Sequence, residues 1–150
     1  MNQHQVALVQ SSWEKVIPIA DIAADVFYEK LFEFDGSLRG LFPQDMKDQK
    51  KKLLATLGRV VSSLDRLPEV LPAVRALGRK HVSYGVKQQH YAVVGAALLA
   101  TLEVGLGDAF NSEVRQAWSE TYGALAKAMS EAANSTSAMN MQAVRASSPA

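Results

Sequence analysis

Apolar residues recur every three or four positions along almost all of this 150-residue chain, and no segment alternates as a β-strand does. In a helix this spacing places the apolar side chains on one face. We therefore predict an all-α domain with a single core and about six to eight helices. The longer predicted helices are one that ends at Pro18, residues 19–34, residues 46–65, one that follows Pro72 and carries His81, residues 88–106 and residues 111–132.

Local features refine this outline. The helix over residues 19–34 is apolar around much of its circumference, which predicts deep burial. The segment between Pro68 and Pro72 is predicted to be irregular, and Gly95 is placed to let another helix approach closely. Residues 1–133 are predicted to form the domain, and residues 134–150, which are small and polar, a flexible tail.

Composition excludes several classes of function. The net charge is +1 with acidic and basic residues interspersed, so we expect no nucleic-acid partner. The chain has no cysteine, and therefore no disulfide, thiolate metal site or thiol nucleophile. No signal peptide is recognisable, and we expect no apolar run to approach a membrane span of about 20 residues. A cytoplasmic protein without a membrane partner is expected.

His81 lies on the same predicted helix face as the apolar residues Val74 and Leu77. An inward-facing imidazole has two interpretations. It is either a core histidine whose ring bonds to a neighbouring carbonyl, or a ligand to a metal or a metal-bearing cofactor. The apolar stripe on its own favours the first interpretation.

Two more polar residues interrupt apolar stripes, Tyr28 and Gln49. Each alone has a structural explanation, because a buried tyrosine often bonds to the backbone and a glutamine often lies at the rim of a stripe. Three such residues on three helices, in a chain without a phosphate-binding loop or paired metal-ligand histidines, indicate a shared pocket. One wall would be His81, and the opposite wall Tyr28 and Gln49, lined by Phe42 and Leu53.

The order and spacing of the motifs resemble those of single-domain bacterial globins of the flavohaemoglobin lineage, over about residues 6–129. The motifs are Phe27-Tyr28, Leu41-Phe42-Pro43, Gln49-x3-Leu53, Leu77-Gly78-Arg79-Lys80-His81, Tyr91-x2-Val94-Gly95 and Trp118-x3-Tyr122-Gly123. The link from Phe42 to Gln49 is a few residues shorter than in flavohaemoglobins. The chain is also similar to neuroglobin-like proteins, which have a histidine in place of Gln49.

This resemblance implies a globin fold around a pocket for haem b. His81 would be the proximal iron ligand, and its second ring nitrogen would donate to a carbonyl near Leu77. Tyr28 and Gln49 would form the distal polar pair. The other implied pocket residues are Phe42 on the porphyrin, Leu53 and Val94 closing the pocket, Lys80 at a propionate, Val86 near His81, and Tyr91 on the proximal side. In flavohaemoglobins that tyrosine pairs with a glutamate, whose position falls here on Ala133, two residues after Glu131.

The expected function is reversible, high-affinity O₂ binding at a five-coordinate ferrous iron, for storage or transport. Tyr28 and Gln49 would donate hydrogen bonds to the ligand, and NO and CO are further expected ligands. One alternative is a nitric oxide dioxygenase in which Tyr28 and Gln49 are catalytic and an external reductase supplies electrons. A gas sensor and a haem-free helical interaction module are two others. A monomer or a weak dimer is expected.

Overall fold

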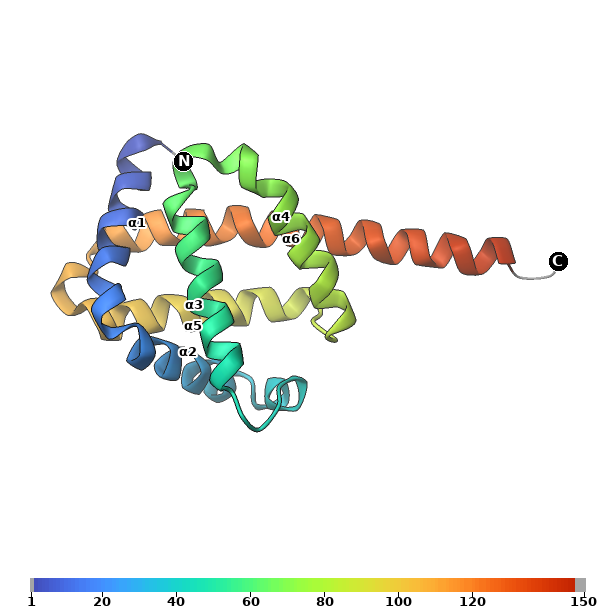
Figure 1. The fold of residues 1–150 in the computed structure, drawn as a ribbon, viewed down its shortest axis with the longest axis horizontal. Coiled ribbons are helices and arrows are strands. Elements are labelled where there is room, and N and C mark those ends of the chain that lie inside the picture. The colour runs from blue at the N-terminus through green and yellow to red at the C-terminus, as the bar shows by residue number, and fades with distance from the viewer. Residues whose placement is uncertain (1, 148–150) are drawn as a thin grey trace.

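The computed structural model describes residues 2–147, with side chains described for residues 2–82 and 84–134. Across this range the chain is helical and contains no strand, so the predicted all-α class is confirmed (Figure 1). The α-helices are α1 (Gln3–Val16), α2 (Ala20–Phe34), α3 (Lys47–Ser62), α4 (Leu67–Ser83), α5 (Gln88–Leu106) and α6 (Ser112–Ser147). The short 3₁₀ helices are η1 (Ile17–Ile19), η2 (Gly36–Leu41), η3 (Leu64–Arg66) and η4 (Gly107–Ala109).

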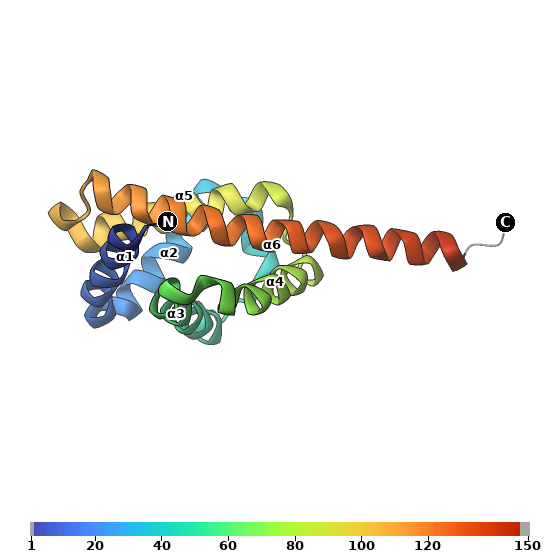
Figure 2. The same cartoon turned by 90° about the horizontal axis from the view of Figure 1, so that it is seen from above.

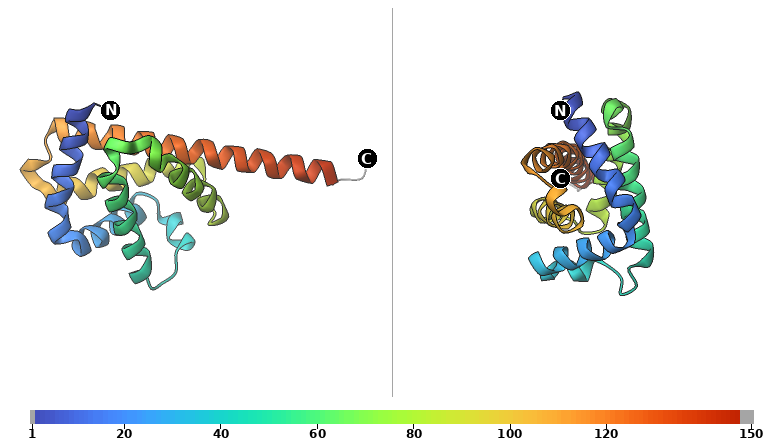
Figure 3. Two further views of the ribbon diagram at one scale, coloured as in Figure 1. Left: turned by 45° about the horizontal axis from the view of Figure 1, so that its top comes forward. Right: turned by 90° about the vertical axis from the view of Figure 1, so that its left-hand side faces the viewer.

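The helices form two layers around one core. Helices α5 and α6 run antiparallel in one layer, and α3 and α4 lie in the other (Figures 1 and 2). Helix α4 packs mainly on α6, and α2 packs mainly on α5. Helices α3 and α4 meet near η3 and diverge toward the start of α3 and the end of α4 (Figures 1 and 3). These two diverging ends carry Gln49 and His81.

The first and last helices are joined through the centre of the core. Trp118 on α6 is 1% exposed, and its ring contacts Trp13 on α1 with the centroids 6.2 Å apart. The indole nitrogen of Trp118 donates a hydrogen bond of 2.8 Å to the buried hydroxyl of Ser12. This bond satisfies both buried polar groups, so the apolar core is closed without an unpaired donor at this point.

Two predictions about helices need correction. The segment between Pro68 and Pro72 is not irregular, because α4 begins at Leu67 and includes both prolines. Pro68 lies in the first turn, where a backbone N–H has no helical partner to lose. Deep burial of α2 is also wrong for its outer side, since Ile22 is 63% and Phe34 47% exposed.

The apolar character of α5 and the length of α6 both bear on predictions from the sequence. Residues 88–109 are long and apolar enough to cross a membrane by length and composition, contrary to the expectation that no run is. Within the fold one side of this segment packs against α1, α2 and α6. Helix α6 continues to Ser147 and projects beyond the other helices (Figure 1). The division of the chain at residue 133 stays a prediction.

Candidate functional site

Tyr28 and Gln49 lie together, as the sequence predicts, and form the distal wall of the candidate site. Tyr28 projects from α2 and is 4% exposed. Gln49 lies in the first turn of α3 and makes a side-chain hydrogen bond with Tyr28. The short link after Phe42 does not prevent this bond, because α3 begins at Lys47, directly after the buried Met46.

The protonation of Tyr28 follows from its surroundings. Burial raises the pKa of the Tyr28 hydroxyl above 10.0, and the bond with Gln49 partly offsets this rise. The Tyr28 O–H and the two amide hydrogens of Gln49 are hydrogen-bond donors, so this wall can present more than one donor to a third group.

Aromatic rings hold Tyr28 in position. The Tyr28 ring meets Phe27 edge-on at 5.0 Å and Phe42 at 5.6 Å between centroids. Such geometries are preferred because the positive edge of one ring faces the negative face of another. Phe42 also meets Phe32 at 5.6 Å. Two walls of rings thus restrict the Tyr28 side chain to one orientation.

Arg39 on η2 stabilises this aromatic group and was not predicted from the sequence. Its guanidinium lies 5.3 Å from the ring centroid of Phe32. It also donates to the carbonyl oxygens of Phe42 at 3.3 Å and Pro43 at 2.9 Å. The chain around Phe42 is irregular, so these bonds satisfy carbonyls that no helix pairs. The only sequence signal was an arginine inside a short helical turn.

His81 forms the proximal wall near the end of α4. Its Nδ1 lies 2.7 Å from the carbonyl oxygen of Leu77, which is the hydrogen bond expected one turn back. A neutral imidazole that donates from Nδ1 carries its lone pair on Nε2. That nitrogen is therefore in the state required of a metal ligand. The backbone carbonyl of His81 accepts from the N–H of Val86 at 3.0 Å, which places Val86 beside the end of α4.

Gly78 fixes α4 against α6, and the sequence analysis missed this role. A Cβ at Gly78 would lie 2.4 Å from the carbonyl oxygen and 2.6 Å from the Cα of Met129. The two helix backbones are therefore in direct contact one turn before His81. An isolated glycine inside a helical pattern often has such a packing reason, and this was the available signal.

Tyr91 at the start of α5 has an unusual hydroxyl. The Tyr91 oxygen is buried and has no hydrogen-bond partner among the described residues. Its pKa is raised by burial. Its backbone carbonyl accepts a bond of 2.6 Å from the hydroxyl of Tyr122. Glu131 is exposed on α6 while Ala133 is buried, so the structure brings no glutamate to the Tyr91 hydroxyl.

The other residues predicted for the pocket differ in how exposed their side chains are. Leu53 and Val94 are half-buried and pack against the core, and Lys80 is exposed on the last turns of α4. The loop after α4 reaches the end of η2 at Gly85, which has a φ of +88° that favours glycine. A Cβ at Gly85 would lie 3.3 Å from Cδ2 of Leu41. The end of η2 and the loop after α4 are therefore in close contact.

These residues fit the haem that the resemblance implies. An iron held by a porphyrin takes a single proximal ligand from the protein, and His81 could be this ligand through its Nε2. Among the described residues there is no group of three or more histidine, aspartate or glutamate side chains that would hold a metal ion without a porphyrin. The orphaned Tyr91 hydroxyl is a further polar group without a protein partner.

Comparisons with known proteins agree with this assignment. The model of the globin family matches residues 25–129. A flavohaemoprotein from Bacillus subtilis is 34% identical over 105 residues, which are 68% of this chain and 26% of that protein. Neuroglobin from Dissostichus mawsoni is 30% identical over 145 residues, covering 87% of this chain and 91% of neuroglobin. The chain thus spans about a quarter of the flavohaemoprotein's length and nearly all of neuroglobin's.

Solved structures give the same result. One is an engineered carbene transferase made from a candidate nitric oxide dioxygenase of Rhodothermus marinus. It has a TM-score of 0.83 and 26% identity, and the match covers 94% of this chain and 99% of that one. A bacterial globin from Campylobacter jejuni has a TM-score of 0.75 at 22% identity, with 89% and 97% covered, which supports the fold.

The resemblance to bacterial globins of the flavohaemoglobin lineage and to neuroglobin is thereby confirmed. Globins carry haem and bind diatomic gases, and the residues described above are compatible with both. The chain belongs to the globin family.

Proposed function

We propose that this protein binds O₂ reversibly and with high affinity, with His81 as the proximal ligand of haem b and with Tyr28 and Gln49 as distal hydrogen-bond donors. When bound, haem b supplies a ferrous iron at which diatomic gases bind. The observation that carries the proposal is the placement of the buried Tyr28 side chain beside Gln49, because both side chains can donate a hydrogen bond to a ligand.

The distal pair distinguishes ligands by their charge. A bound O₂ draws electron density outward and becomes a strong acceptor, whereas CO carries little charge on its oxygen. Hydrogen bonds to a charged acceptor are worth about 1.5–3 kcal/mol each. The hydrogen bond between Gln49 and Tyr28 also couples the two side chains, and coupled hydrogen bonds strengthen one another. Gln49 is a poor iron ligand, so it leaves the distal position open.

The test is ligand dissociation from the Tyr28→Phe variant. This change removes one hydroxyl and keeps the ring, so the aromatic contacts with Phe27 and Phe42 remain. We expect O₂ dissociation to become about 10- to 100-fold faster in stopped-flow measurements, and CO dissociation to change by less than about threefold. Equal acceleration of both gases would contradict the electrostatic role of Tyr28. A haem spectrum matching that of the unchanged protein controls for folding.

Nitric oxide dioxygenation is the second candidate, supported by the flavohaemoprotein relatives and by the Rhodothermus marinus structure. In this reaction NO and O₂ would combine to nitrate, with the haem supplying one electron. An electron donor must return that electron, and the match covers only a quarter of the flavohaemoprotein's length. This candidate therefore requires a reductase activity in addition to the globin domain. The Tyr91 hydroxyl without a glutamate partner argues against this candidate.

Mixing the O₂ complex with NO separates the two functions. For an O₂-binding protein we expect one nitrate per haem and then an oxidised protein that cell extract with NADH does not restore on the same timescale. Repeated turnover with the extract would support the dioxygenase and would contradict O₂ binding as the main role.

A further inference from the structure

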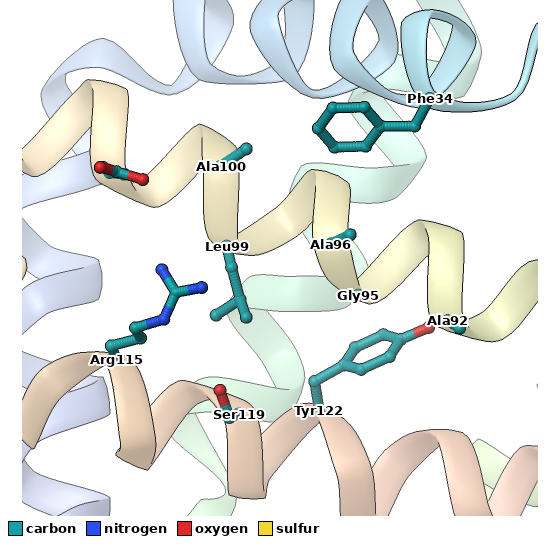
Figure 4. Close-up of a pocket in the computed structure, with 10 residues that line it drawn as sticks. Phe34, Ala92, Gly95, Ala96, Leu99, Ala100, Arg115, Ser119 and Tyr122 are labelled. Carbon is teal, nitrogen blue, oxygen red and sulfur yellow. The ribbon is translucent and has the colours of Figure 1, made fainter. Parts of the chain in front are cut away.

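An open groove lies between α5 and α6, on the face of the molecule turned away from α3 (Figures 2 and 4). Its volume is about 520 Å³. Small residues line it along α5, with Leu99 between the helices and Ser119 and Tyr122 on α6 (Figure 4). The small residues are Ala92, Ala96 and Ala100. None of the proposed ligand-binding residues lines this groove, so it is separate from the distal and proximal walls.

The outer face of α5 is too apolar for a helix that faces water. Glu103 is the single acidic or basic residue between Gln88 and Leu106, apart from His90. Val104 is 61% exposed, and Phe34 at the rim of the groove is 47% exposed. Only 22% of the most apolar window of α5 is buried within the chain. A helix that is apolar on all sides is normally covered on all sides, whereas α5 is covered on its inner side alone.

We propose that this groove is the interface of a homodimer in which α5 of each copy packs on α6 of the other. The charges at the groove support a second copy as the occupant. Glu103 lies near the end of α5 and Arg115 near the start of α6, and the two helices are antiparallel. Both residues therefore line the same end of the groove. In the described part of the chain neither has an ion-pair partner.

A two-fold axis that runs parallel to α5 and α6, midway between them, makes this surface complementary to itself. It sets Glu103 against the partner's Arg115, and Arg115 against the partner's Glu103. Leu99, which points between the two helices, meets its own counterpart near the axis (Figure 4). Closed dimers require such self-complementarity, since each residue pair occurs twice. Because the alanines of α5 are small, the axis of α5 could approach the axis of α6 of the other copy to about 8–10 Å, the usual distance between packed helices.

The first test introduces a charge at the centre of the groove. Ala96→Glu places a carboxylate on an exposed position of α5, and Ala55→Glu makes the same change on an exposed position of α3. We expect the unchanged chain and Ala55→Glu to sediment as dimers over a concentration series, and Ala96→Glu to have a dissociation constant at least about tenfold higher. A monomeric unchanged chain would overturn the proposal, as would an equally stable Ala96→Glu dimer.

The second test reverses the ion pair and does not depend on the first. Glu103→Arg and Arg115→Glu each bring like charges together in the proposed dimer, so each is expected to weaken it about tenfold. The double variant restores two opposite-charge pairs and should return to within about threefold of the unchanged chain. Failure of the double variant to restore dimerisation would overturn the proposed arrangement. Flotation with phosphatidylcholine vesicles tests the alternative that the groove binds lipid. If the unchanged chain is a monomer that floats with the vesicles and Ala96→Glu does not float, the proposed dimer is also overturned.

Discussion

On the distal side Tyr28 is held by other side chains, whereas on the proximal side His81 is held by backbone groups. Tyr28 bonds to the amide of Gln49 and contacts the rings of Phe27 and Phe42. His81 bonds to the carbonyl of Leu77, and its helix rests through Gly78 on the backbone of α6. Side-chain contacts can change by substitution without moving a helix, but backbone contacts change only if the helices move.

This difference separates two properties of the site. Substitutions in the distal wall are expected to alter ligand dissociation while the fold stays intact. Substitutions at the backbone contacts of the proximal wall are expected to alter stability first. The following predictions test that separation.

Gly78→Ala should have the largest effect. The added methyl group would overlap the Met129 backbone, and no flexible side chain is present to yield. We expect the free energy of unfolding to fall by about 2–3 kcal/mol in urea denaturation followed by circular dichroism. Gly123→Ala is the matched control, because a Cβ there meets nothing within 4 Å. It should stabilise α6 by up to about 1 kcal/mol. Equal stability of both variants would contradict the backbone contact.

Gln49→Leu should have an intermediate effect, and on dissociation only. It removes one donor to the ligand and the amide that bonds with Tyr28. We expect O₂ dissociation to accelerate about tenfold, which corresponds to one hydrogen bond of about 1.4 kcal/mol. CO dissociation and the urea midpoint should stay near those of the unchanged protein. A large loss of stability without a change in O₂ release would contradict the expectation that distal substitutions alter dissociation and leave the fold intact.

The smallest effects on stability are expected from replacing Tyr122 and Tyr91 by phenylalanine, because only the Tyr122 hydroxyl has a hydrogen bond within the described residues. The Tyr122 hydroxyl donates to the Tyr91 carbonyl, so Tyr122→Phe should destabilise the protein by about 1 kcal/mol. The Tyr91 hydroxyl is buried with no hydrogen-bond partner among the residues that the structure describes, so Tyr91→Phe should leave the apoprotein equally stable or up to about 1 kcal/mol more stable. The measurement is urea denaturation of both apoproteins. A loss of stability in Tyr91→Phe would mean that this hydroxyl has a partner.

Much of the fold was predictable because the main signals were periodic. The span of α5 was predicted in full, and the close approach at Gly95 is confirmed, since a Cβ there would lie 2.8 Å from the Tyr122 ring. The burial of α2 was not predictable from its composition. The sequence gives the apolar character of Ile22 but not the number of neighbours around its helix.

The candidate site was predicted less completely. Tyr28, Gln49 and His81 were identifiable because polar residues interrupt apolar stripes. The start of α3 was predicted to within one residue, but the bond between Tyr28 and Gln49 also depends on how α2 and α3 pack, which periodicity does not reveal. The roles of Arg39 and Gly78 were missed, because their partners are the backbone carbonyls of Phe42 and Met129, whose positions a residue pattern does not specify.

The contact between Gly78 and Met129 also has a mechanical consequence. Helix α6 runs unbroken for 36 residues, and 18 of them follow Met129 and extend toward Ser147. An α-helix rises about 1.5 Å per residue, so this arm reaches about 27 Å beyond the contact. A tilt of about 5° at Met129 would displace its far end by about 2 Å. A small tilt of α6 against α4 at Gly78 would therefore move the far end of α6 much more than the contact itself.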